Sequence, residues 1–218
     1  MTNTLLDPRV ATALTDMFRH AEHDDETSRR YRARHQAGAP PMTPQEYADA
    51  AAEVYMPISA DGGRLLYNLV RAIRPATVVE FGTSFGISAL HLAAALRDND
   101  AGRLISTELS AAKVAAARRT FAETGLADLI TVLQGDARET LAALDSPVDF
   151  VLLDGWKDLC LPVLRLLEPH LAPGTLVVAD DVDLTDLQPY LDYVRDPANG
   201  YQSVTFPVED GMEISCRL

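Results

Sequence analysis

Cysteine, tryptophan and basic residues are all scarce in this chain. The two cysteines, Cys160 and Cys216, are too few among 218 residues for a disulfide framework, so we expect free thiols and a cytoplasmic protein. Lys and Arg number 19 against 32 Asp and Glu, which gives a formal net charge of −13. A field of this sign repels nucleic acid and anionic membranes, and it suits a neutral or cationic small ligand or a metal ion.

Long apolar runs are also missing. No stretch approaches the roughly 18 apolar residues of a membrane helix, and the first residues do not have the pattern of a signal peptide. The apolar content of 47% nevertheless suits a globular protein with a full core. We expect one domain over residues 1–218, made of an N-terminal helical extension (1–55) and a core (56–218).

The N-terminal extension has helical apolar spacing at 8–23, and a second helix is predicted over 43–55 with Thr43 as its N-cap. The first helix could pack on the chain's own sheet or on a second subunit, so a homodimer is one of the two possibilities. A basic cluster between them favours a solvated helix face over a docking site for an anionic partner. It consists of Arg29, Arg30, Arg32 and Arg34.

In the core, apolar strand-like runs alternate with helical segments. Five such runs lie at 77–82, 102–108, 130–136, 148–154 and 174–181, with helices predicted at 61–73, 87–97, 110–125, 137–144, 160–171 and 184–196. Continuous apolar strands separated by helices indicate a parallel sheet buried on both faces. Two last strands, 201–208 and 211–218, are joined by a hairpin signal. The predicted fold is therefore α/β: a doubly wound (Rossmann-like), mostly parallel seven-stranded sheet with a C-terminal antiparallel hairpin and N-terminal helices.

Each of the five parallel strands ends in an acidic residue. These residues are Glu80, Glu108, Asp136, Asp154 and the pair Asp180 and Asp181. Chance would scatter acids over both ends of a sheet, whereas ligands of doubly wound folds bind outside the carboxyl ends of the strands. The asymmetry therefore favours a binding site at that edge.

The glycines after the first strand and the acid after the second favour a nucleoside ligand. Gly82 and Gly86 allow a tight turn, although the G-x-G-x-x-G fingerprint of dinucleotide binding is absent. Glu108 lies where a carboxylate can hold the ribose hydroxyls. Because phosphate-binding elements are poor and the pocket is acidic, S-adenosylmethionine fits best. The alternatives are that Glu108 is a helix N-terminal acid and that Asp136 is a helix cap.

Asp154, Asp180 and Asp181 follow strands that we expect to be neighbours. Three carboxylates this close cannot all stay ionised without a positive group among them. A hard divalent cation such as Mg²⁺ prefers oxygen ligands of this kind. The alternative is that one or two of the acids cap the following helix.

Several segments together resemble a known family. They are YMPISADGGRLL (55–66), VVEFGTSFGISAL (78–90), LISTELS (104–110), FVLLDGWKDLCLP (150–162), LAPGTLVVADDV (171–182) and DGMEIS (210–215). Over about residues 50–218 the chain resembles the class I S-adenosylmethionine-dependent O-methyltransferases of the catechol O-methyltransferase type.

The resemblance implies specific roles. Lys157 is the general base toward a small hydroxylated aromatic substrate with vicinal hydroxyls. Mg²⁺ is held by Asp154, Asp180 and Asp181. Trp156 packs beside the adenine or the substrate, and Ser88 holds the methionine carboxylate. The implied cofactor contacts are Met56, Ile58, Glu80, Gly82, Ser88, Glu108, Asp136, Ala137, Asp154 and Trp156.

Two positions depart from the family pattern. Asp181 stands where the family usually has asparagine, and Val204 aligns with a glutamate that accepts a hydrogen bond from the second hydroxyl of catechol. A larger aromatic diol is therefore an alternative substrate. Lys157 could instead form only a salt bridge with Asp154 or Asp158. A metal-independent methyltransferase and a nucleotide-binding oxidoreductase are the competing functions.

Overall fold

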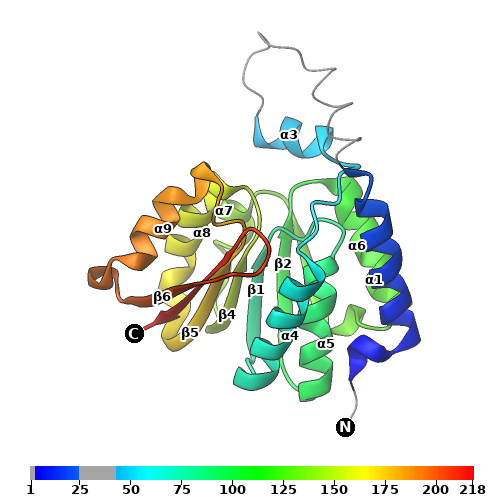
Figure 1. Cartoon of the computed structure of the whole chain (residues 1–218), viewed down its shortest axis with the longest axis horizontal. Coiled ribbons are helices and arrows are strands. Elements are labelled where there is room, and N and C mark those ends of the chain that lie inside the picture. The colour runs from blue at the N-terminus through cyan, green and yellow to red at the C-terminus, as the bar shows by residue number, and fades with distance from the viewer. Residues whose placement is uncertain (1–2, 25–42) are drawn as a thin grey trace.

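The computed structural model describes residues 3–24 and 43–218, and its centre is a seven-stranded sheet in the order β3-β2-β1-β4-β5-β7-β6 (Figure 1). Strands β1 to β5 run parallel, and β7 is antiparallel to both β5 and β6. The predicted mostly parallel sheet with a C-terminal antiparallel hairpin is thus confirmed. The strands are β1 (Thr77–Phe81), β2 (Arg103–Glu108), β3 (Ile130–Gln134), β4 (Val148–Leu153), β5 (Leu171–Ala179), β6 (Tyr201–Phe206) and β7 (Met212–Arg217).

Helices cover both faces of the sheet, as the alternation of side chains along the strands requires. Val78 and Phe150 join one apolar cluster with α1, α4, α5 and α6, whereas Val79 and Val151 join a second cluster with α7, α8 and α9. The α-helices are α1 (Pro8–Ala21), α3 (Pro44–Ala50), α4 (Ala60–Ile73), α5 (Ile87–Asn99), α6 (Ala111–Thr124), α7 (Ala137–Thr140), α8 (Cys160–Leu167) and α9 (Gln188–Arg195). Short 3-10 helices span Thr4–Leu6, Ala127–Leu129, Lys157–Leu159, Glu168–His170, Thr185–Leu187 and Pro197–Asn199.

Local signals explain where several helices begin and end. Thr43 caps α3 in a capping box with Glu46, as predicted, but the helix ends at Ala50 rather than at residue 55. The helix predicted over 160–171 ends at Leu167, because Pro169 has no N–H to donate to the preceding turn. Pro189 likewise belongs in a first turn, so α9 begins at Gln188 and not at residue 184.

The register of the central strands brings the loops after β1, β4 and β5 together. Phe81 pairs with Leu153, and Leu153 pairs with Ala179, so the residues that follow them emerge at one edge of the sheet. Gly82 has φ +101°, and a Cβ there would lie 2.6 Å from the carbonyl oxygen of Asp154. Glycine is needed at this point because the two loops touch through their backbones.

The N-terminal part of the chain packs through α1 against α5 and α6 (Figure 1). The basic cluster Arg29, Arg30, Arg32 and Arg34 lies outside the described residues. Cys160 and Cys216 are both free thiols, as expected. Within the described ranges, no helix has the length and apolar character needed to cross a membrane.

Candidate active site

A cavity of about 450 Å³ opens at the carboxyl ends of the parallel strands. Its walls come from the loops after β1, β2, β3, β4 and β5, from α3, and from the segment that leads into α4. All but one of the site residues predicted from the sequence line it. These are Met56, Ile58, Gly82, Ser88, Glu108, Asp136, Ala137, Asp154, Trp156, Lys157, Asp180 and Asp181.

The three acids predicted as metal ligands converge at one end of the cavity. Asp154, Asp180 and Asp181 each offer a carboxylate oxygen, and these oxygens lie within 4.8 Å of one another. Oδ1 of Asp180 is buried and has no hydrogen-bond partner. Burial, followed by the charges of Asp154 and Asp181, raises the pKa of Asp180 to about 8. An unpartnered buried oxygen among three acids fits a hard divalent cation in its donor set.

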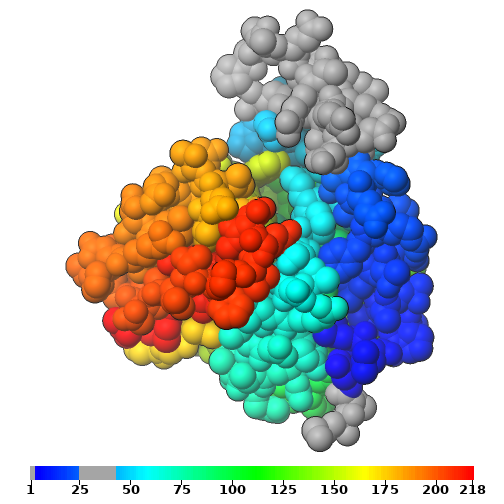
Figure 2. All heavy atoms as spheres, viewed as in Figure 1, coloured from blue at the N-terminus to red at the C-terminus, as the bar shows by residue number. Residues whose placement is uncertain are grey.

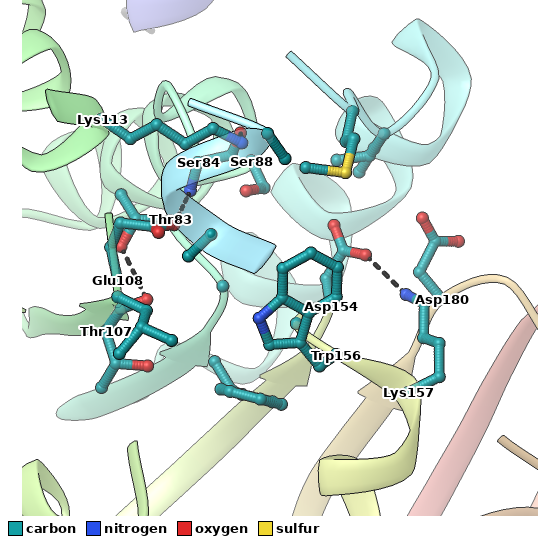
Figure 3. Close-up of a pocket in the computed structure, with 18 of the residues that line it drawn as sticks. Thr83, Ser84, Ser88, Thr107, Glu108, Lys113, Asp154, Trp156, Lys157 and Asp180 are labelled. Carbon is teal, nitrogen blue, oxygen red and sulfur yellow. Dashed lines mark hydrogen bonds and ion pairs between the residues drawn. The ribbon is translucent and has the colours of Figure 1, made fainter. Parts of the chain in front are cut away.

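Lys157 forms ion pairs with two of these acids, and Figure 3 shows the one with Asp154 as a dashed line. Its Nζ is 3.0 Å from Oδ1 of Asp154 and 2.9 Å from Oδ2 of Asp181. Burial alone lowers the pKa of Lys157, but the carboxylates of Asp154 and Asp181 outweigh it, so that this pKa lies above its ordinary value. The lysine is therefore an ammonium in the structure as it stands. The salt bridge to Asp154 that we considered from the sequence is present, and Asp181 rather than Asp158 is the second partner.

Glu108 ends β2 at the opposite side of the cavity. Its Oε2 accepts a hydrogen bond from Ser84 N at 2.8 Å, and its Oε1 accepts one from Ser110 N at 2.7 Å. The N-cap of α6 is Ser110 and not Glu108. Each carboxylate oxygen has a second lone pair, so Glu108 can still accept the hydroxyls of a ribose.

Asp136 combines the two roles that the sequence left open. It lines the cavity, and it is also the N-cap of α7, because Oδ1 accepts a hydrogen bond from Arg138 N at 2.8 Å. The guanidinium of Arg138 also pairs with this carboxylate and lowers the pKa of Asp136.

Glu80 is the predicted cofactor contact that lies behind the cavity wall. Its side chain is wholly buried and accepts hydrogen bonds from Ser88 Oγ at 2.6 Å and from the hydroxyl of Ser106. Burial raises the pKa of Glu80 to about 7 despite these two hydrogen bonds. Ser88, predicted to hold the methionine carboxylate, therefore connects Glu80 with the cavity.

Trp156 forms part of the cavity wall together with α3. The ring of Tyr47 meets the indole edge-on, with 4.9 Å between ring centroids, and Pro44 and Ala48 of the same helix also line the cavity. Sequence reasoning missed α3 as a wall element, because its helical pattern carries no sign of what it covers.

The two departures from the family pattern have different outcomes. The side chain of Val204 is 62% exposed on β6, whereas the acids Glu209 and Asp210 of the hairpin loop line the cavity. Oε2 of Glu209 accepts a hydrogen bond from Ser59 N at 2.7 Å, so the hairpin lies against the start of α4 (Figure 2). Asp181 has φ +60°, a left-handed conformation that asparagine and aspartate tolerate better than most residues.

Comparisons with known proteins agree with this fold and site. Residues 79–182 match the family described as "Methyltransferase domain". Catechol O-methyltransferase B of Danio rerio is 30% identical over 177 residues, which make up 75% of this chain and 66% of that protein. A probable O-methyltransferase of Mycobacterium tuberculosis is 35% identical over 149 residues, or 63% of each protein. The chain thus spans just under two thirds of the length of these two relatives.

Two further matches concern a mammalian relative and a solved structure. Catechol O-methyltransferase of Sus scrofa is 31% identical over 147 residues, which cover 64% of this chain and 78% of that protein. An O-methyltransferase from Bacillus cereus, solved in complex with SAH, superposes with a TM-score of 0.68 at 20% identity and covers 93% of this chain and 100% of its own. The likeness to the Bacillus cereus structure shows the fold, which is that of a methyltransferase. The chain belongs to the S-adenosylmethionine-dependent O-methyltransferases, and within them to the catechol O-methyltransferase-like family.

Proposed function

We propose that the protein transfers the methyl group of S-adenosylmethionine to one hydroxyl of a small aromatic vicinal diol, with a divalent cation such as Mg²⁺ in the site. The observation that carries this proposal is the cluster of three carboxylates, in which Oδ1 of Asp180 is buried and has no hydrogen-bond partner. Oxygen-only donors of this kind are those that Mg²⁺ prefers. The two free thiols are compatible with a cytoplasmic location.

We assign to Lys157 the role of general base, which takes the proton from the attacking hydroxyl. A divalent ion held by Asp154, Asp180 and Asp181 would acidify an adjacent hydroxyl and offset the negative charge that keeps Lys157 protonated. The amine of Lys157 is buried beside this cluster and can then accept the proton of the attacking hydroxyl. A phenol has a pKa near 10, so removal of its proton at neutral pH needs such a base.

The other end of the cavity suits the methyl donor. Glu108 would hold the ribose, and the acidic lining would complement the positive charge of the sulfonium and ammonium groups. Trp156 and the apolar side chains of Leu159 and Leu184 line the space near the acids, where an aromatic ring can pack. These walls orient the hydroxyl toward the methyl group and exclude water.

Two measurements test the proposal. Calorimetry should show that the protein binds S-adenosylhomocysteine and does not bind NADH, because the dinucleotide fingerprint is absent. A panel of catechol-containing compounds should then be methylated, with activity lost in chelator and restored by Mg²⁺. Full activity in chelator would reject the metal and favour the metal-independent methyltransferase. Binding of NADH alone would reject methyl transfer.

A further inference from the structure

Hydrogen bonds hold the backbone of Tyr55 from two sides where this residue lines the cavity. On one side, Oδ1 of Asp24 accepts a hydrogen bond from Tyr55 N at 2.8 Å, and Oδ2 accepts one from Met56 N at 2.7 Å. On the other side, the hydroxyl of Ser84 donates to the carbonyl oxygen of Tyr55 at 2.6 Å. Asp24 follows α1, and Ser84 belongs to the glycine loop after β1, so three distant segments of the chain meet at this peptide.

Met56 is held in a strained conformation at this point. Its φ is +44°, in the left-handed region that residues other than glycine, asparagine and aspartate rarely adopt. Met56 and Ile58 line the cavity, and the side chain of Met56 is 46% exposed. Such strain persists only where surrounding contacts impose it, and the Asp24 carboxylate on two successive amides is the contact that does so here.

Lys113 also lines the cavity, and it reaches the same peptide through Ser84. Its Nζ donates to the hydroxyl of Ser84 at 3.1 Å and lies 5.6 Å from the centre of the Phe85 ring. That ring stacks on Tyr55, with 4.0 Å between centroids. Lys113 is only 3% exposed, and among the described residues no carboxylate forms a direct ion pair with it. A lysine buried at this cost indicates a role beyond solubility.

We propose that Asp24 and Lys113 are positioning residues for the methyl donor, which clamp Tyr55 and Met56 against the glycine loop and so shape the cofactor end of the cavity. The inference rests on the proposed function, since it assumes that S-adenosylmethionine occupies this cavity. It assigns to the N-terminal helix a part in cofactor binding, because α1 delivers Asp24. Neither residue touches the acids at the other end, so the clamp acts on the donor and not on the metal or the acceptor.

Calorimetry with S-adenosylhomocysteine on the full chain tests the clamp. Asp24→Asn removes the charge and one acceptor oxygen, and Lys113→Met removes the ammonium but keeps the apolar stem. Each should weaken the affinity about tenfold, since a hydrogen bond to a charged group has about that effect. The matched controls are Glu22→Gln, an exposed acid at the end of α1, and Arg119→Met, an exposed cation on α6; both should bind as the wild type does.

Two further readouts separate positioning from mere structural support. The KM for the methyl donor should rise while the KM for the acceptor and the affinity for Mg²⁺ stay at wild-type values. The double variant should be less than additive, because both residues act on one peptide. Wild-type affinity in both single variants would overturn the clamp alone. A wild-type protein that binds no S-adenosylhomocysteine would overturn the proposed function, and the clamp with it.

Discussion

Lys157 and Asp181 form an ion pair of 2.9 Å between two loops that follow neighbouring strands, β4 and β5. The ammonium is nearly buried, with its side chain 11% exposed, and a second carboxylate, Asp154, holds it on the other side. Lys157, the proposed base, is thus held as an ammonium between two of the proposed metal ligands. Removal of either partner should therefore change catalysis and metal binding in different ways.

Lys157→Ala should lower turnover sharply and leave cofactor affinity close to wild type. Loss of a positioned base lowers the rate by about 10²–10⁴-fold. Steady-state kinetics with a catechol acceptor, together with calorimetry using S-adenosylhomocysteine, provides the check. The adjacent exposed acid offers a control, because Asp158→Asn should have little effect on either quantity. If cofactor binding collapsed with turnover, the lysine would be structural.

Asp181→Asn should weaken the binding of Mg²⁺. The variant keeps an oxygen ligand at a left-handed position that asparagine tolerates, but it removes one of three negative charges. We expect a loss of affinity of about tenfold, because ligand charge sets the affinity of such sites. Calorimetry with Mg²⁺ measures it, and Asp183→Asn, an exposed acid of the same loop, is the control. An unchanged affinity would show that Asp181 is not a ligand.

Glu80→Gln should stabilise the protein at neutral and alkaline pH and leave it unchanged in acid. The pKa of Glu80 is raised from 4.5 to about 7 by burial, so the folded state binds the proton more tightly than the unfolded state does. The wild type therefore loses stability as the pH rises from 4.5 to about 7, and the glutamine variant avoids that loss. The gain should approach about 3 kcal/mol above pH 7, at 1.36 kcal/mol for each pKa unit.

Urea unfolding at pH 4.5 and pH 8 measures this difference between the wild type and the Glu80 variant. Glu123→Gln, at an exposed position on α6, should show no such pH dependence. A variant that is less stable than the wild type at pH 8 would show that Ser88 and Ser106 need the charged carboxylate.

The efficiency of methylation should depend on the charge of the acceptor, because the hairpin loop between β6 and β7 is acidic. Glu209 and Asp210 line the cavity near the acidic cluster, so a catechol with an ammonium side chain should be methylated more efficiently than one with a carboxylate. We expect a ratio of kcat/KM of about tenfold, a typical size for electrostatic selection in a cleft lined by one sign of charge. Glu209→Gln should reduce that ratio. Equal efficiencies in the wild type would exclude charge selection at this loop.

Much of the fold follows from local patterns in the sequence. The apolar runs predicted the five parallel strands, because a strand buried in a parallel sheet has few alternatives, and the hairpin signal predicted β6 and β7. Helix ends were less predictable. Pro169 and Pro189 could each begin a new helix or interrupt an old one, and the pattern alone does not distinguish these cases.

The site was predictable where its residues come directly after strands. Asp154 and Asp180 follow positions that pair across β4 and β5, so their meeting is a consequence of topology. Asp24 and Lys113 were not predictable in this way. Asp24 reaches the backbone of Tyr55 and Met56 through the packing of α1. Lys113 lies on a helix whose sequence does not show which face is buried. The direction of the pKa shift of Lys157 also depends on distances that spacing does not reveal.

The pairing of Phe81 with Leu153 and of Leu153 with Ala179 has a consequence for motion. Backbone hydrogen bonds in the middle of a sheet open only with global unfolding, whereas segments at the rim open locally. We therefore expect the acids at the ends of β4 and β5 to be attached to the most slowly exchanging part of the molecule. For the same reason, we expect the charged centre to keep its shape from one turnover to the next.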